Sequence, residues 1–390
     1  MRILFLASEV ASGTGGIRAF NRHLIDVLVA EGHAVSVVSM NDTGSCGATR
    51  FALYPCARWR PVRKFAFVAQ ACLQALLFRP DAIVCGHVNF LPVCGFLGAA
   101  FRILYLTVIH GLELQKLGPW KTAWLKGSKK IMAVSSFTKT RLLRFCAGYA
   151  EASVVVVGNT FDVERFNPAP KPAYLMEKLK IQEDQKVVLT VARLAKGEGY
   201  KGYDKVLLAM RRVVKEFPGV RYVIAGSGSD MPRMRKLIQD YQLRDCAILA
   251  GFVADREIPD YYNLCDVFVM PSTGEGFGIV FLEALACGKP VIAGNLDGSR
   301  EALVDGELGI LVNPHDTEEL SEVITKVLRK DVDPRFLDGN FLRQSAIRHF
   351  GIERFREKIR KILSSKDAPV SPSKKDAPGI QVCRGADKTG

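Results

Sequence analysis

The sequence predicts an α/β protein built from two doubly wound domains that face each other across a cleft. Its 390 residues exceed the length over which a single hydrophobic core usually grows. Short apolar runs typical of buried strands alternate with helix-like stretches from the first residue, and this alternation is typical of parallel sheets. It pauses at a proline-containing segment over 166–184 and then resumes. These observations predict a first domain over 1–168 and a second over 169–345.

The predicted strands are short apolar runs separated by helical or loop segments. In the first domain they span 2–7, 34–39, 82–86, 103–109, 130–134 and 153–157. In the second domain they span 186–192, 221–225, 247–251, 267–270, 290–293 and 309–312. The segment 166–184 lacks strand character and is predicted to be a linker. Residues 365–390 are predicted to be disordered, because they bury too little apolar surface to offset the entropy of ordering.

The composition, with 48% apolar and 24% charged residues, is that of a globular protein. The uncharged run 82–101 is long enough to span a membrane, but His87, Asn89 and Pro92 interrupt it, which favours a strand, a loop and an apolar helix. Ten cysteines include no Cys-x-x-Cys pair, and Glu9 stands where a signal peptide needs apolar length. We therefore expect reduced thiols, a cytoplasmic location, no metal site and no bound cofactor.

Basic residues are concentrated in the first domain. Residues 1–165 hold 19 basic and 9 acidic side chains, whereas residues 166–390 hold 35 and 31. Between Asp42 and Glu113 the only acid is Asp81. The resulting positive face either meets an anionic acceptor or the headgroups of the inner membrane leaflet, or is solvated without a specific partner. The cluster expected at such a membrane is Arg58, Trp59, Arg60, Arg63 and Lys64. Nucleic acid is not expected, because no basic and aromatic platform accompanies the charge.

A glycine-rich turn over 12–16 lies between the first predicted strand and the following helix. Backbone amides at such a helix start favour an anion or a hydroxyl, and Gly15 and Gly16 would let a ligand approach closely. A plain tight turn explains the same residues equally well. Arg18 stands where the dinucleotide fingerprint requires its third glycine, which disfavours a dinucleotide oxidoreductase.

A second glycine-rich loop, over 271–278, follows the predicted strand 267–270. Ligands of open α/β sheets bind at such carboxyl ends of strands. Glu275 stands on this loop and Glu283 on the predicted helix after it, so the two acids could hold separate parts of one elongated ligand, such as a sugar and a ribose. For an isolated glutamate on a helix, a solvated surface position is the alternative interpretation.

The run EGFGIVFLEALACGKP, from Glu275 to Pro290, resembles the Glu-x7-Glu signature of family-four retaining glycosyltransferases with the GT-B fold. The resemblance covers roughly residues 1–363. Shorter matches to the same family occur along the rest of the chain, in the order expected for the family. They are Gly15-Gly16, Gly32-His33, His110-Gly111, residues 133–136, Gly158-Asn159, Arg193-Leu194, residues 200–202, and Glu301 with Gly306 and Gly309. The resemblance implies an acceptor-side first domain, a nucleotide-sugar-binding second domain and a C-terminal crossover helix over 346–364 that packs back toward the first domain.

The resemblance also implies roles for single residues. Arg193 and Lys201 would offset the charge of the leaving diphosphate, and Lys196, within an insertion before Lys201, competes for that role. His110 would contact the donor sugar near the reacting carbon, and Glu275 would orient the sugar hydroxyls. The other implied donor contacts are Gly15, Gly16, Gly276, Phe277, Gly278, Ile279 and, on the ribose, Glu283. No residue is implied to act as a covalent nucleophile.

The implied activity is transfer of a sugar from a UDP- or GDP-sugar to a glycan or lipid-linked acceptor, without a metal, in the synthesis of cell-surface polysaccharide or glycolipid. The enzyme would work in the cytoplasm, and its basic first domain would hold it at the inner leaflet. Two alternatives remain open at this point. A sugar-nucleotide epimerase of the same architecture would act on the donor alone, and a sugar-nucleotide-binding protein would not turn it over.

Overall fold

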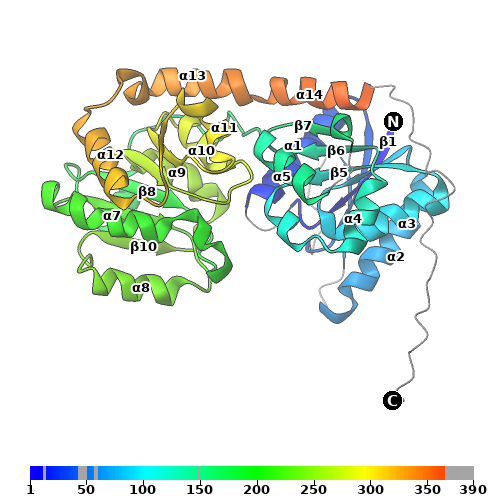
Figure 1. The fold of residues 1–390 in the computed structure, drawn as a ribbon, viewed down its shortest axis with the longest axis horizontal. Helices are drawn as coiled ribbons and strands as arrows, with labels where there is room; N and C mark the ends of the chain where they lie inside the picture. Colours follow the sequence, from blue (N-terminus) through cyan, green and yellow to red (C-terminus); the bar gives the residue numbers. More distant parts are fainter. Residues whose placement is uncertain (12–14, 43–50, 57–59, 147–149, 365–390) are drawn as a thin grey trace, which may run out of the picture.

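The computed structural model describes residues 1–11, 15–42, 51–56, 60–146 and 150–364. These residues form two parallel sheets, one in each domain (Figure 1). The first sheet has the order β3-β2-β1-β4-β5-β6-β7 and the second β10-β9-β8-β11-β12-β13. The predicted fold class, two doubly wound α/β domains, is therefore confirmed.

The strands lie close to the predicted ranges. The first sheet contains β1 (Arg2–Ala7), β2 (Ala34–Ser39), β3 (Ala52–Pro55), β4 (Ala82–Cys85), β5 (Leu104–Ile109), β6 (Lys130–Ala133) and β7 (Val154–Val156). The second contains β8 (Val187–Val191), β9 (Arg221–Ala225), β10 (Ala247–Gly251), β11 (Val267–Met270), β12 (Val291–Gly294) and β13 (Ile310–Val312). In both sheets the strand order reverses beside the first strand of the domain, and this is where open α/β sheets form a crevice.

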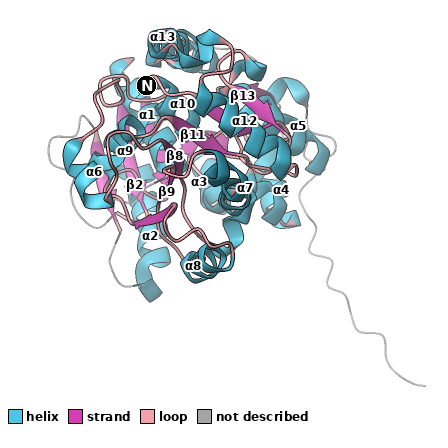
Figure 2. Cartoon of the chain, turned by 90° about the vertical axis from the view of Figure 1, so that its left-hand side faces the viewer, coloured by secondary structure: helices cyan, strands magenta, loops and turns pink. Residues whose placement is uncertain are grey.

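Helices cover both faces of each sheet, as Figure 2 shows for β8, β9 and β11. Those of the first domain include α1 (Gly16–Ala30), α2 (Arg60–Phe78), the 3-10 helix η1 (Val88–Phe90), α3 (Leu91–Phe101), α4 (Pro119–Lys126) and α5 (Ser136–Phe145). Those of the second are α6 (Ala173–Leu179), η4 (Lys196–Lys201), α7 (Tyr203–Glu216), α8 (Met231–Asp240), η5 (Asp255–Glu257), α9 (Ile258–Leu264), α10 (Ile279–Ala286), α11 (Ser299–Ala302) and α12 (Thr317–Arg329). Val188 and Leu189, neighbours on β8, lie in two different core clusters because successive strand residues point to opposite faces.

Two elements differ from the prediction. The segment 166–184, predicted to be a linker without strand character, contains helix α6, whose Leu175 is fully buried. The prolines of this segment end at Pro172, directly before the helix, where proline does not disturb the helical hydrogen bonds. Strand β3 was not predicted, because an edge strand with half-buried residues lacks the continuous apolar run of a central strand.

The C-terminal helices cross from the second domain to the first. Helix α13 (Gly339–Phe350) contacts α10, and α14 (Ile352–Ser364) continues along the first domain (Figure 1). The ring of Phe355 packs edge-to-face on Phe20 of α1 at 5.6 Å, and Arg360 Nε donates to Glu31 Oε2 at 2.8 Å. This confirms the predicted return of the crossover helix. The tail 365–390, predicted to be disordered, lies outside the described residues.

The uncharged run 82–101 forms β4, η1 and α3, as the sequence predicts. In the part of the chain that the structure describes, no helix is both long and apolar enough to cross a bilayer. The cysteines within that part are free thiols, and all of them except Cys72 are buried.

Candidate active site

The two domains touch where the β11–α10 loop of the second domain meets the end of β5 in the first. The carbonyl oxygen of Gly276 accepts hydrogen bonds from Ser135 Oγ at 2.5 Å and Thr138 Oγ1 at 3.3 Å. A Cβ atom at Gly276 would overlap the carbonyl oxygen of His110. Glycine at this position therefore allows the two domains to approach each other beside His110.

The first glycine-rich turn reaches the same place. Gly15 has φ 120°, a value that L side chains rarely adopt, and it precedes the first turn of α1. A Cβ atom on Gly16 would lie 3.5 Å from Cγ2 of Ile279, at the start of α10. The structure thus brings Gly15, Gly16, His110 and the loop from Glu275 to Ile279 together in one cleft.

Two cations of the second domain reach this cleft, and each pairs with a carboxylate. Lys201 Nζ lies 2.7 Å from Glu275 Oε1, and both side chains are mostly buried. Arg193 pairs with Glu198, and its own side chain is 75% exposed. Lys196 is exposed, so Lys201 is the lysine that the structure places beside Glu275.

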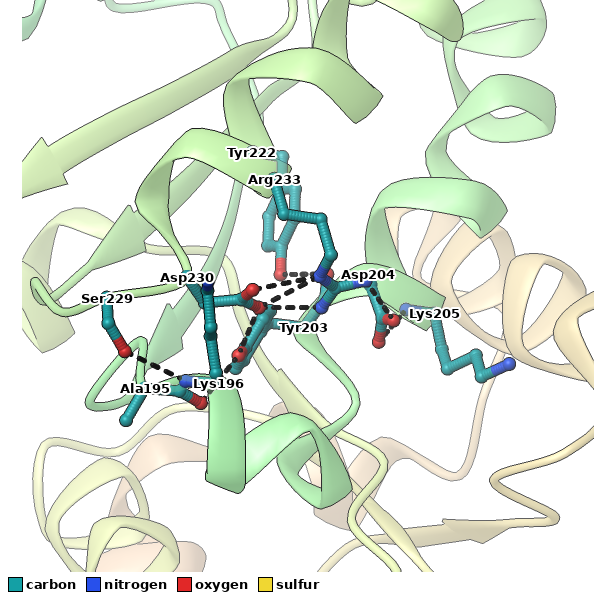
Figure 3. A network of polar contacts seen from close by, with 9 residues as sticks. All are labelled: Ala195, Lys196, Tyr203, Asp204, Lys205, Tyr222, Ser229, Asp230 and Arg233. Atoms are coloured by element: carbon teal, nitrogen blue, oxygen red, sulfur yellow. Dashed lines mark hydrogen bonds and ion pairs between the residues drawn. The ribbon is translucent and has the colours of Figure 1, made fainter.

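The loop that carries Arg193 and Lys196 lies beside a polar network in which Tyr203 and Asp230 are buried and Arg233 is partly exposed (Figure 3). Asp230 accepts a hydrogen bond from the Tyr203 hydroxyl at 2.8 Å and forms an ion pair with Arg233 at 2.7 Å. The backbone N–H of Asp230 donates to the carbonyl of Leu194 at 2.8 Å. Arg233 and Tyr203 lower the pKa of Asp230 below its ordinary value, so the carboxylate stays charged and keeps its contacts with both residues.

Asp297 positions Glu275, and the sequence analysis did not identify it. Its carboxylate, 3% exposed, accepts hydrogen bonds from the backbone N–H of Glu275 at 2.7 Å, from Ser272 Oγ at 2.8 Å and from the N–H of Ser299 at 2.9 Å. Burial raises the pKa of Asp297, and these hydrogen bonds oppose that rise. Asp297 precedes a glycine, a pairing usually found in a turn, so the sequence alone did not mark it as functional.

A further contact between the domains comes from Glu301. Its two carboxylate oxygens accept the backbone N–H groups of Ser136 and Phe137, each at 2.8 Å. These are free donors at the start of α5, so an acid of the second domain caps a helix of the first. This cap and the contacts of Gly276 hold the domains together on the same side of the cleft.

His110 lies on the first-domain wall with a neutral imidazole. Burial lowers the pKa of His110 to about 4. Its Nε2 lies 3.2 Å from the carbonyl oxygen of Gly86, and since a carbonyl only accepts, Nε2 carries the proton and Nδ1 keeps its lone pair. The ring packs edge-to-face on Phe20 at 5.3 Å, and the backbone N–H donates to Glu113 Oε1 at 2.5 Å. The side chain is thus fixed in orientation and tautomer.

Glu283 lines a cavity of about 280 Å³ between α1 and the second domain. Burial raises the pKa of Glu283 to about 7, although the Tyr262 hydroxyl, which donates to Oε2 at 2.8 Å, opposes the rise. The same cavity is lined by Arg18, which pairs with Asp255 at 2.7 Å. A carboxyl group at this position can accept hydrogen bonds from the hydroxyls of a ribose.

We expect nucleotide-sugar binding to tighten as the pH rises toward about 7 and then to level off. In the free protein Glu283 is protonated below its pKa of about 7, and it must lose that proton to bind a ribose as a carboxylate. Affinity should therefore fall by about tenfold for each pH unit below this value. Calorimetric titration of the wild type and of Glu283→Gln between about pH 6 and 8 measures this, because only the wild type should show the pH dependence. If the affinity of the wild type and that of Glu283→Gln depend on pH in the same way, then Glu283 does not bind the nucleotide-sugar as a carboxylate.

The remaining predicted residues are Phe277, predicted to contact the donor, and the cluster predicted to contact a membrane. The ring of Phe277 is 3% exposed and packs against Phe350 of α13 at 5.6 Å, so only its backbone can meet a donor. In the predicted membrane cluster, Arg58 and Trp59 lie outside the described residues, as does the side chain of Arg60. Arg63 and Lys64 belong to the beginning of α2, and Lys64 is exposed.

Two family models match the chain, one over each domain. Residues 14–165 match Glycosyltransferase Family 4, and residues 174–337 match Glycosyl transferases group 1. The chain is a glycosyltransferase of the family-four type. The matches leave residues 1–13, 166–173 and 338–390 outside them, and the loops of the cleft described above lie within them.

The transferase is similar in sequence to two named glycosyltransferases. The GDP-mannose-dependent alpha-(1-6)-phosphatidylinositol monomannoside mannosyltransferase of Mycobacterium tuberculosis is 26% identical over 352 residues, covering 84% of this chain and 89% of that protein. The D-inositol 3-phosphate glycosyltransferase of Streptosporangium roseum is 30% identical over 227 residues, covering 54% of this chain and 51% of that protein.

Solved structures share the fold of the transferase. Anabaena HepE in complex with UDP-glucose superimposes with a TM-score of 0.77 at 21% identity, covering 93% of this chain and 99% of that chain. Sucrose-phosphate synthase from Thermosynechococcus elongatus superimposes with a TM-score of 0.76 at 21% identity, covering 93% and 98%. These likenesses confirm the predicted GT-B architecture.

Proposed function

We propose that this transferase moves a sugar from a nucleoside diphosphate sugar to a glycan or lipid-linked acceptor, with retention of anomeric configuration and without a metal or other cofactor. The observation that carries the proposal is the meeting of three groups from both domains in one cleft. Lys201 and Glu275 form an ion pair on the second-domain side, and the loop of Glu275 contacts the backbone of His110 on the other. A cation, an acid and a neutral imidazole suit a diphosphate, sugar hydroxyls and the sugar ring, respectively.

The diphosphate of the donor would replace the two glutamates as the partner of the cations in the cleft. Arg193 and Lys201, each paired with a glutamate in the structure, would turn to the diphosphate and offset the charge that develops as it leaves. The N–H groups at the start of α10 add favourable partial charge at the same place. We propose that these groups supply the countercharge that a divalent metal supplies in other transferases.

The transfer itself is a substitution at the anomeric carbon. The acceptor hydroxyl attacks this carbon from the face that the diphosphate leaves, the bond from carbon to phosphate oxygen breaks, and the hydroxyl proton passes to that phosphate oxygen. Glu275 accepts hydrogen bonds from the sugar hydroxyls, held in position by Asp297. In this scheme the two glutamates do not act as a hydrolytic acid and nucleophile pair.

The names of the relatives support the class of donor and acceptor. One relative is described as GDP-mannose-dependent and as forming an alpha-(1-6) linkage on a phosphatidylinositol mannoside, and HepE was solved with UDP-glucose. Both donors are nucleoside diphosphate sugars, and an α product from such a donor, whose sugar is ordinarily α-linked, retains configuration. We therefore propose a role in cell-surface polysaccharide or glycolipid synthesis on the cytoplasmic side of the membrane.

A donor screen followed by a release assay tests this function. The correct nucleotide-sugar should raise the melting temperature, because a ligand that binds only the native state stabilises it. With that donor, nucleotide release should require an acceptor glycan or glycolipid. Conversion of the donor sugar without acceptor and without nucleotide release would indicate an epimerase. Stabilisation without any conversion, across a panel of glycan and lipid-linked acceptors, would indicate a binding protein.

A further inference from the structure

Helix α2 exposes a row of large apolar side chains. Phe65 is 78% exposed, Leu77 is 71% exposed and Leu76 is 56% exposed. Val62 and Leu73 are also exposed, at 48% and 45%. Single exposed apolar residues are ordinary on protein surfaces, but a contiguous group on one helix marks an interaction site. We call these five residues the α2 face.

The α2 face is the exposed side of a helix that carries apolar residues on both its exposed and its buried side. At 100° per residue, Val62, Phe65 and Leu76 fall within one narrow sector of α2. On the opposite side Phe67 and Ala71 are buried in the first-domain core. The rotation of the helix is further fixed by buried Gln74, whose Oε1 accepts from Ser36 Oγ at 3.1 Å. The apolar row therefore points to solvent because the helix is anchored from behind.

The neighbouring helices extend this apolar character. Helix α3, which contacts α2, exposes Phe96 and Phe101, and α4, which contacts α3, exposes Trp120 at 75%. Figure 1 shows α2 on the side of the first domain opposite α14. Among the described residues of the second domain, the exposed large apolar side chains are Tyr174, Phe252 and Leu296. The exposed apolar surface is thus concentrated on the first domain, around α2 and its neighbours.

The charges around the α2 face are positive. No charged residue stands between Lys64, at the start of the face, and Arg79, just beyond its end. No acid stands between Asp42 and Asp81, and Asp81 already accepts the backbone N–H of Arg2 at 2.6 Å. An apolar row with cations at both ends is complementary to a bilayer with anionic headgroups.

We propose that the α2 face is a membrane-docking surface that inserts into the headgroup region of an anionic bilayer. Apolar side chains would enter the boundary of the acyl chains, and the flanking cations would contact lipid phosphates. The cluster predicted from the sequence to contact a membrane contains four cations and Trp59. The structure adds a row of exposed apolar side chains that could enter the bilayer below the headgroups. The proposal deepens the proposed function, since a lipid-linked acceptor would be presented at the same surface.

The docking surface is continuous with the edge of the cleft. Lys121, next to exposed Trp120, donates from Nζ to Asn89 Oδ1 at 2.6 Å. Asn89 belongs to η1, in the connection that leaves the carboxyl end of β4. His87 precedes η1 and accepts the backbone N–H of Asn89 at Nδ1 at 3.1 Å. A headgroup carried by the bilayer would therefore reach the first-domain wall of the cleft without crossing the protein.

Co-sedimentation with vesicles tests the surface without any turnover. The full chain is mixed with phosphatidylcholine vesicles or with phosphatidylcholine–phosphatidylglycerol vesicles at low and high salt. The double variant Phe65→Ser/Leu77→Ser should bind anionic vesicles about tenfold more weakly than the wild type, with an unchanged melting temperature. Tyr174→Ser, an exposed aromatic of the second domain, is the matched control and should bind as the wild type does. Arg63→Ser/Lys64→Ser should bind more weakly and with less dependence on salt.

Three results would overturn the docking surface: no binding of the wild type to anionic vesicles at low salt, equal binding to neutral vesicles, or unchanged binding by Phe65→Ser/Leu77→Ser. A dimer in sedimentation equilibrium that dissociates in this variant, without vesicle binding, would assign the α2 face to a second copy of the chain. Turnover on a soluble acceptor is measured in parallel. Turnover without vesicle binding would overturn the docking surface alone, and vesicle binding without turnover would overturn the proposed function alone.

Discussion

Glu275→Ala and Lys201→Ala are each expected to lower turnover at saturating donor by about two orders of magnitude or more. Glu275 is held by Asp297 in the position where it would meet the sugar hydroxyls, and Lys201 lies 2.7 Å from it. Each substitution removes a preorganised polar contact in a cleft rather than part of an apolar core. Steady-state kinetics with the donor found by the screen measures the effect, and the melting temperature reports the fold.

The matched control for Lys201 is Lys205→Ala. Lys205 is exposed on α7, four residues further along the chain, and should retain the turnover of the wild type. If Glu275→Ala and Lys201→Ala also keep near-normal turnover with every donor that the wild type uses, then the cleft residues have been assigned wrongly. If turnover falls only in variants whose melting temperature also falls, then these residues stabilise the fold and do not take part in catalysis.

Gly276→Ala is expected to abolish most activity, because the added methyl group would overlap the carbonyl oxygen of His110. The loop of Glu275 would then have to shift, and the hydrogen bonds from Ser135 and Thr138 to the carbonyl of Gly276 would be lost. A misplacement of about 1 Å in such a site lowers the rate by about a hundredfold. Turnover at saturating donor and acceptor measures this effect.

Gly219→Ala serves as the control for a glycine substitution in the same domain. A Cβ atom there would meet only the side chain of Gln185, at an ordinary 3.7 Å, so both stability and turnover should be preserved. Normal turnover in Gly276→Ala would mean that the domains do not need this close approach for the reaction.

Much of the fold was predictable because parallel sheets buried on both faces require continuous apolar strands. Strand β1 illustrates this, since Ile3, Leu4, Phe5 and Leu6 are all fully buried. Strand β3 was not predicted because it lies at the edge of the sheet, where a strand is less buried and does not need a continuous apolar run. Helix α6 was not predicted because it is short and follows closely spaced prolines, a composition that is typical of linkers.

The site was predictable only in part. Glu275 stands out in the sequence because glycines surround it, whereas Asp297 acts through the backbone N–H of Glu275, in a loop that lies elsewhere in the chain. The choice of Lys201 over Lys196 depended on which ammonium group reaches Glu275, and this is a property of the folded η4 segment. The site roles of these residues remain predictions until the variants above are assayed.

The exposure of the α2 face could not be predicted from the sequence alone either. The run from Phe65 to Phe78 has no charge, so the sequence alone does not separate a buried helix from one with an exposed apolar side. The exposure of Phe65 and Leu77 follows from how Phe67 and Gln74 anchor the opposite side. Tertiary packing, rather than helical periodicity, decides which side meets the solvent.

The anomeric configuration of the product tests the central claim most directly. With an α-linked nucleotide-sugar as donor, proton NMR of the freshly formed product should show an α linkage. EDTA should leave the rate unchanged, because in the proposed mechanism Arg193 and Lys201 would provide the countercharge. A β-linked product, or a rate that EDTA abolishes and a divalent metal restores, would contradict the account.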